Sequence, residues 1–73
     1  MIRKTYKHYQ VEIISSAERE GYQAWAKITP PVSAGGAFSI LDRGYETKKE
    51  AEEALWEEAK KRIDQAIAKK KGG

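Results

Sequence analysis

The sequence predicts an α+β fold: a three-stranded antiparallel sheet in β-β-β-α order, with one long C-terminal helix packed on one face. Apolar and polar residues alternate over residues 6–14 and 22–29, as they do in strands that bury one face. From residue 48 onward, apolar residues recur at helical spacing instead. The 73 residues are enough for a single domain with one core, and the short links favour neighbouring antiparallel strands.

The first strand is predicted over residues 6–14. Its inward side chains are the apolar ones of one parity: Tyr9, Val11 and Ile13. Its outward side chains are polar: His8, Gln10 and Glu12. Tyr6 and Ile14 interrupt the alternation, because both fall on the polar parity. The polar segment 15–21 ends in glycine and is predicted to be the connection to the next strand.

The second strand is predicted over residues 22–29. Its natural inward set is Tyr22, Ala24, Ala26 and Ile28. This assignment leaves Trp25 and Lys27 together on the face away from the core. In the alternative parity Trp25 belongs to the core, because tryptophan prefers burial, but its inward neighbours would then be polar. Pro30-Pro31 ends the strand, since proline has no amide hydrogen for the ladder.

A short third strand is predicted over residues 37–41, with Phe38 and Ile40 pointing inward. It follows a glycine-containing loop over residues 32–37. Residues 42–45 are predicted to form the turn that leads out of this strand. The glycines of the loop lie between two strands, so we interpret them as part of a hairpin connection and not as a phosphate-binding loop.

The helix is predicted over residues 48–68, and residues 69–73 are predicted to be a frayed basic tail. Thr47 with Glu50 three residues later is typical of a capping box at a helix start. Two favourable i,i+4 ion pairs are expected along it: Glu57–Lys61 and Glu58–Arg62. The helix is acidic first and basic last, which is the order that a helix dipole favours.

The predicted core combines the inward strand residues with the apolar stripe of the helix. Its members are Tyr9, Val11, Ile13, Tyr22, Ala24, Ala26, Ile28, Phe38, Ile40, Leu55, Trp56, Ala59 and Ile63. One helix covers only one face of a sheet. The second face is therefore predicted to be solvated, self-associated or used for binding.

Composition excludes several kinds of chemistry. The chain has no cysteine, so it forms no disulfide, thiolate nucleophile or zinc finger. His8 is the only imidazole, and no nucleophile or metal-ligand spacing accompanies it. We therefore expect no enzymatic activity, no catalytic residues, no metal and no cofactor. The start of the sequence has no apolar leader, and no segment is apolar enough to span a membrane, so we expect a cytoplasmic protein.

Segments of the chain resemble three kinds of known protein, and each resemblance implies a fold or a function. Residues 6–13 (YKHYQVEI), 25–28 (WAKI) and 45–52 (YETKKEAE) together resemble small uncharacterised bacterial single-domain proteins. This resemblance implies a β-β-β-α fold and no known activity. The segment GYETKKEAE is similar to the sheet-to-helix junction of AP2-like, arm-type DNA-binding domains of phage integrases. That likeness implies DNA reading by the open sheet face, with Trp25, Lys27 and Gln10 on the reading surface.

The run TKKEA at residues 47–51 also resembles the last helix of double-stranded RNA-binding domains. In those domains, lysines at the start of the helix lie over phosphates. The resemblance therefore implies phosphate contacts for Lys48 and Lys49.

Two functions follow from these patterns. The first is a nucleic-acid-binding module, indicated by a net charge of +3, the basic helix end and Lys27 beside Trp25. The second is a protein-binding adaptor or inhibitor, or a homodimer formed through the open sheet face or an edge strand. An outward Trp25 would share its surface with Tyr6, His8 and Glu12. The candidate binding residues are Trp25, Lys27, Gln10, His8, Gln23, Lys48 and Lys49.

Overall fold

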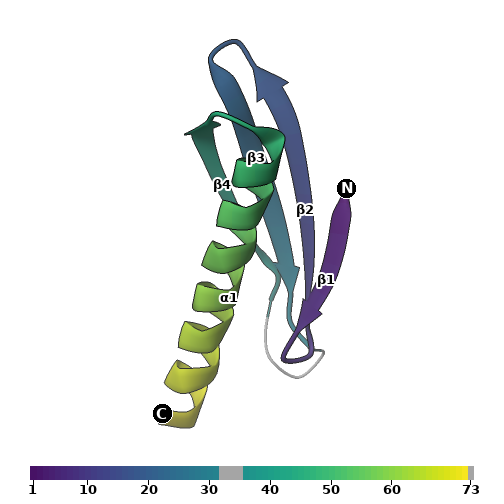
Figure 1. The fold of residues 1–73 in the computed structure, drawn as a ribbon. Coiled ribbons are helices and arrows are strands. Elements are labelled where there is room, and N and C mark those ends of the chain that lie inside the picture. Colours follow the sequence, from purple (N-terminus) through teal and green to yellow (C-terminus); the bar gives the residue numbers. More distant parts are fainter. Residues whose placement is uncertain (32–35, 73) are drawn as a thin grey trace.

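The computed structural model describes residues 1–31 and 36–72, and it has four strands followed by one helix (Figure 1). The elements are β1 (Ile2–Tyr6), β2 (Tyr9–Glu18), β3 (Gly21–Thr29), β4 (Phe38–Tyr45) and α1 (Lys48–Gly72). The strands form one antiparallel sheet in the order β1-β2-β3-β4, and α1 lies against one face of it. The α+β class and the C-terminal helix are confirmed, but the sheet has four strands and not three.

The first error concerns the additional strand, β1, which pairs with β2 from Ile2 opposite Ile13 to Tyr6 opposite Tyr9. Residues Lys7 and His8 form the two-residue turn between these strands, so they split the strand predicted over 6–14. Both turn residues have positive φ, 50° and 72°, as in the type I′ turn that suits a hairpin. The signal for β1 was weak, because its inward residues include a lysine.

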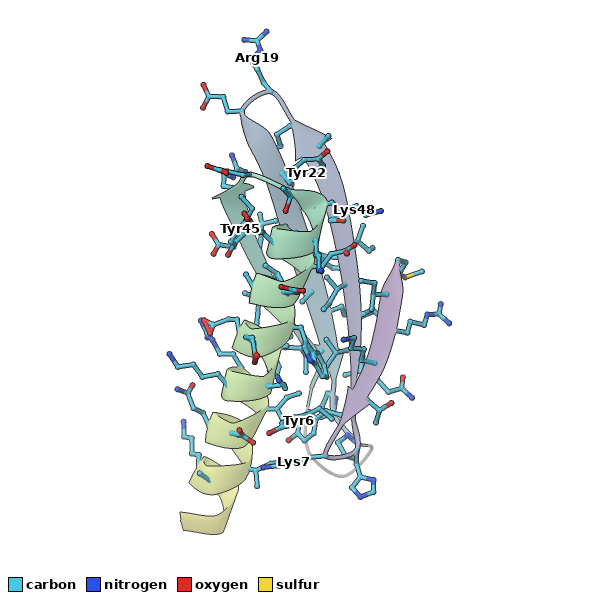
Figure 2. All side chains as sticks on the ribbon, viewed as in Figure 1. Tyr6, Lys7, Arg19, Tyr22, Tyr45 and Lys48 are labelled. Atoms are coloured by element: carbon cyan, nitrogen blue, oxygen red, sulfur yellow. The ribbon has the colours of Figure 1, made fainter. Side chains whose placement is uncertain are left out.

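The connection predicted over residues 15–21 is also much shorter than expected. Strand β2 continues to Glu18, and only Arg19 and Glu20 form the turn, which lies at the tip of the hairpin (Figure 2). The polar Ser15 fits inside the strand because its hydroxyl lies 3.0 Å from a carboxylate oxygen of Glu52 in α1, to which it donates a hydrogen bond.

Gly21 is required where β3 begins. Its φ is +137°, and a Cβ at this position would lie 2.5 Å from the carbonyl oxygen of Tyr45. The backbone of β4 therefore passes too close to Gly21 for any larger residue.

The third strand and the helix are both longer than predicted. Residues 42–45, predicted as a turn, belong to β4, and a register shift opposite Tyr22 and Gln23 accommodates Gly44 at φ +92°. The helix continues to Gly72, so residues 69–72, predicted as a frayed tail, are helical. Lysine favours helix, so the basic end does not stop it. In the predicted loop, residues 36–37 are irregular, while 32–35 and 73 lie outside the described residues.

The predicted core is confirmed, because every residue assigned to it is buried or packs against the buried cluster. The buried members come from β2, β3 and α1: Tyr9, Val11, Ile13, Ala24, Ala26, Ile28, Ala51, Leu55, Ala59 and Ile63. The Glu50 amide donates to the Thr47 hydroxyl at 3.1 Å, which confirms the helix cap. Of the two expected helix pairs, Arg62–Glu58 forms at 3.9 Å, while Glu57 pairs with Lys60.

The backbone of α1 lies near β2, β3 and β4, and β1 is attached to the helix through side chains. The Tyr6 ring meets Trp56 edge-on at 6.1 Å, and the Lys4 ammonium lies 4.7 Å from the centre of the Trp56 ring. Tyr6 and Lys7 point toward the helix (Figure 2), where both donate to the Asp64 carboxylate. The Lys7 hydrogen bond lowers the pKa of Asp64, and that same bond raises the pKa of Lys7.

Candidate interaction surface on the open sheet face

A row of three large apolar side chains crosses the open sheet face, which is the face that α1 does not cover. Trp25 of β3 is the register partner of Ile14 in β2 and of Leu41 in β4. Their exposed fractions are 41% for Ile14, 36% for Trp25 and 55% for Leu41. Directly opposed residues of neighbouring strands are close enough for their side chains to touch. We call Ile14, Trp25 and Leu41 the apolar row.

The outward position of Trp25 follows from the small residues on either side of it. Ala24 and Ala26 are completely buried on the face of β3 that α1 covers. Because side chains alternate along a strand, the residue between them must point to the open face. The structure therefore has the parity in which Trp25 is outward, and not the alternative in which it joins the core.

Polar side chains border the apolar row on both sides. On one side lie Arg3, Glu12, Lys27 and Ser39, which are consecutive register partners across all four strands. On the other side lie Ser16, Gln23 and Arg43. The Gln23 amide donates to the Ser16 hydroxyl at 3.0 Å, and Arg3 lies 3.9 Å from Glu12. With Glu18 further along β2, this face carries three cations and two anions, a net charge of +1.

The predicted binding residues divide among three places. Trp25, Lys27, Gln10 and Gln23 all lie on the open face. His8 lies in the turn between β1 and β2. Lys48 and Lys49 begin α1, where Lys49 borders a hollow together with Lys4 and Trp56 on the covered side of the sheet. A flat ligand on the open face therefore does not reach these two lysines.

Tyr6 was expected on the open face and lies instead on the covered side. Its ring packs against Trp56, and its hydroxyl contacts Asp64. The cause is the two-residue turn at Lys7 and His8, which begins a new strand at Tyr9 with Tyr6 and Tyr9 as direct partners. Opposed residues of an antiparallel pair point to the same face, so Tyr6 follows Tyr9 inward.

Sequence reasoning missed two members of the apolar row and two cations of its border. Ile14 was noted only as an interruption of the alternation, and Leu41 only as the last residue of a short strand. Arg3 and Arg43 were placed outside the strands altogether. Ile14 and Leu41 already had the parity of the open face within the predicted strands, so only the strand register was missing for them. Arg3 and Arg43 have that parity once β1 and the end of β4 are recognised as strands.

A second feature is the groove between β4 and α1, whose volume is about 470 Å³. Apolar side chains including Ile40 and Leu55 line it, and charged ones from β4 and α1 border it. The Tyr45 hydroxyl donates to Asp42 at 2.8 Å, and this bond, together with the Arg43 amide, lowers the pKa of Asp42. The same hydrogen bond and partial burial raise the pKa of Tyr45.

Residues 1–31 and 36–72 contain no group of three or more His, Cys, Asp or Glu side chains positioned to hold a metal ion. Over the same residues, the helix is not long and apolar enough to cross a membrane. Compared with known proteins, the chain matches no family model, no curated protein and no solved structure.

Proposed function

We propose that the chain is a small non-enzymatic binding module that receives a partner protein on its open sheet face, as an adaptor or an inhibitor does. The apolar row is the observation that carries this proposal. Three large side chains on adjacent strands, each more than a third exposed, meet at the middle of an otherwise polar surface. A tryptophan flanked by aliphatic residues and rimmed by polar groups has the composition of a protein-binding hot spot.

The charges on this face favour a protein over a nucleic acid. Phosphate recognition depends on clustered cations, and the open face has a net charge of only +1. Ile14 and Leu41 beside the indole are aliphatic, so they offer burial to an apolar partner and no stacking surface to a base. Mixed charges on the rim supply specificity in protein interfaces, where single-sign charge is not needed.

The test compares three immobilised chains in a nuclease-treated lysate of the native host. These are the wild type, Trp25→Ala and Glu53→Ala, the last an exposed substitution on α1 as a matched control. We expect the wild type and the control to retain the same proteins and Trp25→Ala to lose them by about 30-fold in affinity, as for a central hot-spot residue. Equal retention by all three chains would exclude the open face, provided circular dichroism shows that each chain is folded.

Nucleic-acid binding by the same face is the second candidate, and Lys27 next to Trp25 favours it. No ion pair of Lys27 occurs among the described side chains, so its ammonium is available to a phosphate while Trp25 stacks on a base. The emission of both tryptophans, Trp25 on the open face and Trp56 beside Lys49, is followed while short duplex DNA and RNA are added at about 50 mM and about 200 mM salt. Binding that falls steeply with salt and is lost in Lys27→Ala would support this candidate.

The same titration distinguishes the helix start from the sheet. If the Lys48→Ala, Lys49→Ala double variant loses binding while Lys27→Ala keeps it, the phosphates contact α1 as in the double-stranded RNA-binding resemblance. If no chain binds at about 50 mM salt, nucleic acid is excluded as the partner.

A further inference from the structure

The outer edge of β4 is the second surface suited to association. Over residues 1–31 and 36–72, β4 pairs only with β3, so its other side presents unpaired backbone groups along Phe38–Tyr45. The opposite edge of the sheet, β1, is only five residues long, and a short edge strand discourages strand addition. The β4 edge is eight residues long and has Ile40 and Leu41 at its centre.

The groove beside this edge is bordered by charged side chains from β4 and α1. The helix runs back along β4 from Tyr45 toward Phe38 (Figure 1), so later helix residues lie beside earlier strand residues. Glu58 and Tyr45 both line the groove, and Asp42 accepts a hydrogen bond from the Tyr45 hydroxyl. Lys61 and Arg62 border the groove one helical turn further on, toward the Phe38 end. The groove therefore has charges of both signs side by side along its rim, and Glu58 and Arg62 form an ion pair within it.

We propose that the β4 edge pairs antiparallel with β4 of a second copy of this chain, forming a continuous eight-stranded sheet with a two-fold axis at Leu41. A two-fold contact brings the same surface of each copy together with its ends exchanged. Because the rim of the groove has both signs of charge, no single-sign patch of one copy faces the same patch of the other. This pairing leaves both open faces uncovered, and it does not depend on the function proposed above.

The strand itself selects the register. Directly opposed residues of an antiparallel pair point to the same face, and side chains alternate between the faces along each strand. If both helices lie on the same face of the joined sheet, an even-numbered residue of one β4 must therefore lie opposite an even-numbered residue of the other, and an odd-numbered residue opposite an odd-numbered one. Among the registers that meet this condition, only those with the two-fold axis at Leu41 or at Asp42 pair nearly the whole length of β4. Centring on Asp42 places two carboxylates opposite each other, which is unfavourable. Centring on Leu41 places Asp42 opposite Ile40 and Arg43 opposite Ser39, and it joins the two apolar rows into one.

The first experiment compares two lysine substitutions within the apolar row by sedimentation velocity. Leu41→Lys places two ammonium groups together at the two-fold axis, while Ile14→Lys makes the same chemical change two strands away from the edge. We expect the wild type to show twice the chain mass of 8.3 kDa as concentration rises, Ile14→Lys to do the same, and Leu41→Lys to stay at the single mass. Both variants alter exposed positions, and circular dichroism checks that each is folded.

A wild type that remains at the single mass up to about 500 µM would overturn the proposal. So would a dimer that both lysine variants abolish, because this result would place the contact on the open sheet face. The function proposed above is tested separately, since a monomer can still bind a different protein through Trp25.

Amide hydrogen exchange of the wild type gives a second measurement that needs no variant. We expect the outward-facing amides of β4 to become more protected as concentration rises, while those of β1 do not change. Exchange of β4 amides that is independent of concentration would contradict edge pairing, whatever mass the chain shows.

Discussion

The two faces of the sheet are made by the same strands, and they differ in what covers them. Ile13 and Ile14 are neighbours in β2, yet Ile13 is 1% exposed and Ile14 is 41% exposed. The helix covers the first face, and the described part of the chain leaves the second uncovered. The comparison teaches that an apolar residue acquires its role from its parity, since the same side chain is core on one face and contact surface on the other.

The covered face also holds most of the specific polar contacts between elements. Ser15 binds Glu52, while Tyr6 and Lys7 bind Asp64. On the open face the corresponding contacts are the Gln23–Ser16 hydrogen bond and the distant Arg3–Glu12 pair, both between neighbouring strands. Stability is therefore concentrated on one face, which leaves the composition of the other free to serve binding.

The largest expected difference in stability is between Ile13→Ala on the covered face and Ile14→Ala on the open face. Ile13→Ala removes buried methyl groups and leaves a cavity, so it should lower the free energy of unfolding by about 2–5 kcal/mol. Ile14→Ala removes an exposed side chain and should cost about 0.5 kcal/mol. Urea denaturation of both variants measures the difference. Equal losses would mean that a partner copy buries the open face under the conditions used.

A smaller loss of stability is expected for a substitution at Gly21, where the backbone of β4 lies close to the start of β3. Gly21→Ala should lower the free energy of unfolding by about 2 kcal/mol or more, since φ is unfavourable and the new Cβ meets the Tyr45 carbonyl. Gly44→Ala is the control: it has positive φ and open space around it, so it should lose only about 1 kcal/mol. If Gly44→Ala is the more destabilised of the two in thermal unfolding, the close contact at Gly21 is not what matters.

A gain in stability is expected at the turn that directs Tyr6 to the covered face. His8→Gly relieves a left-handed conformation at φ 72° and should raise the free energy of unfolding by about 0.5–1 kcal/mol. The imidazole has no described hydrogen bond, so the main opposing cost is the larger backbone entropy that glycine loses on folding, and we expect the relief of strain to exceed it. Denaturant titration at pH 7 measures the change, and a loss of stability would show that His8 contributes a contact to the turn.

The smallest expected effect is on the stability of the fold at acidic pH. The pKa values of Asp42 and Asp64 are lowered by the hydrogen bonds that they accept. Their contribution is therefore complete above the unfolded pKa of about 3.9 and is lost as pH falls through the lower folded values. We expect Asp64→Asn to flatten slightly the dependence of stability on pH below about 4, because solvent screens the contacts of this exposed carboxylate. Arg3→Gln, on the open face, should leave that dependence unchanged.

Much of the covered face was predictable from the sequence, because burial imposes a periodic pattern. Val11, Ile28 and Ile63 recur at strand or helix spacing, and each is buried as expected. The helix start at Thr47 was predictable for a similar reason, since its hydroxyl cap is a local contact. Strand β1 was not predictable in this way, because the inward position of Lys4 depends on Trp56, which is distant in the sequence.

The candidate surface was only partly predictable. Trp25 and Lys27 were assigned to the open face from parity alone, and they lie there. Ile14 and Leu41 join Trp25 through strand register, which links residues 11 and 16 positions apart along the chain. The sequence of one strand does not determine which residues of the neighbouring strands lie opposite its own.

By itself, the sequence determined the α+β class, the core, the helix start and the parity of the central strands, because each depends on periodicity or on contacts between near neighbours. Only the tertiary structure decided the fourth strand, the lengths of β2 and β4, the apolar row and the free β4 edge. These features arise when segments distant in the sequence pair or pack, and the free energy of such contacts belongs to both partners together.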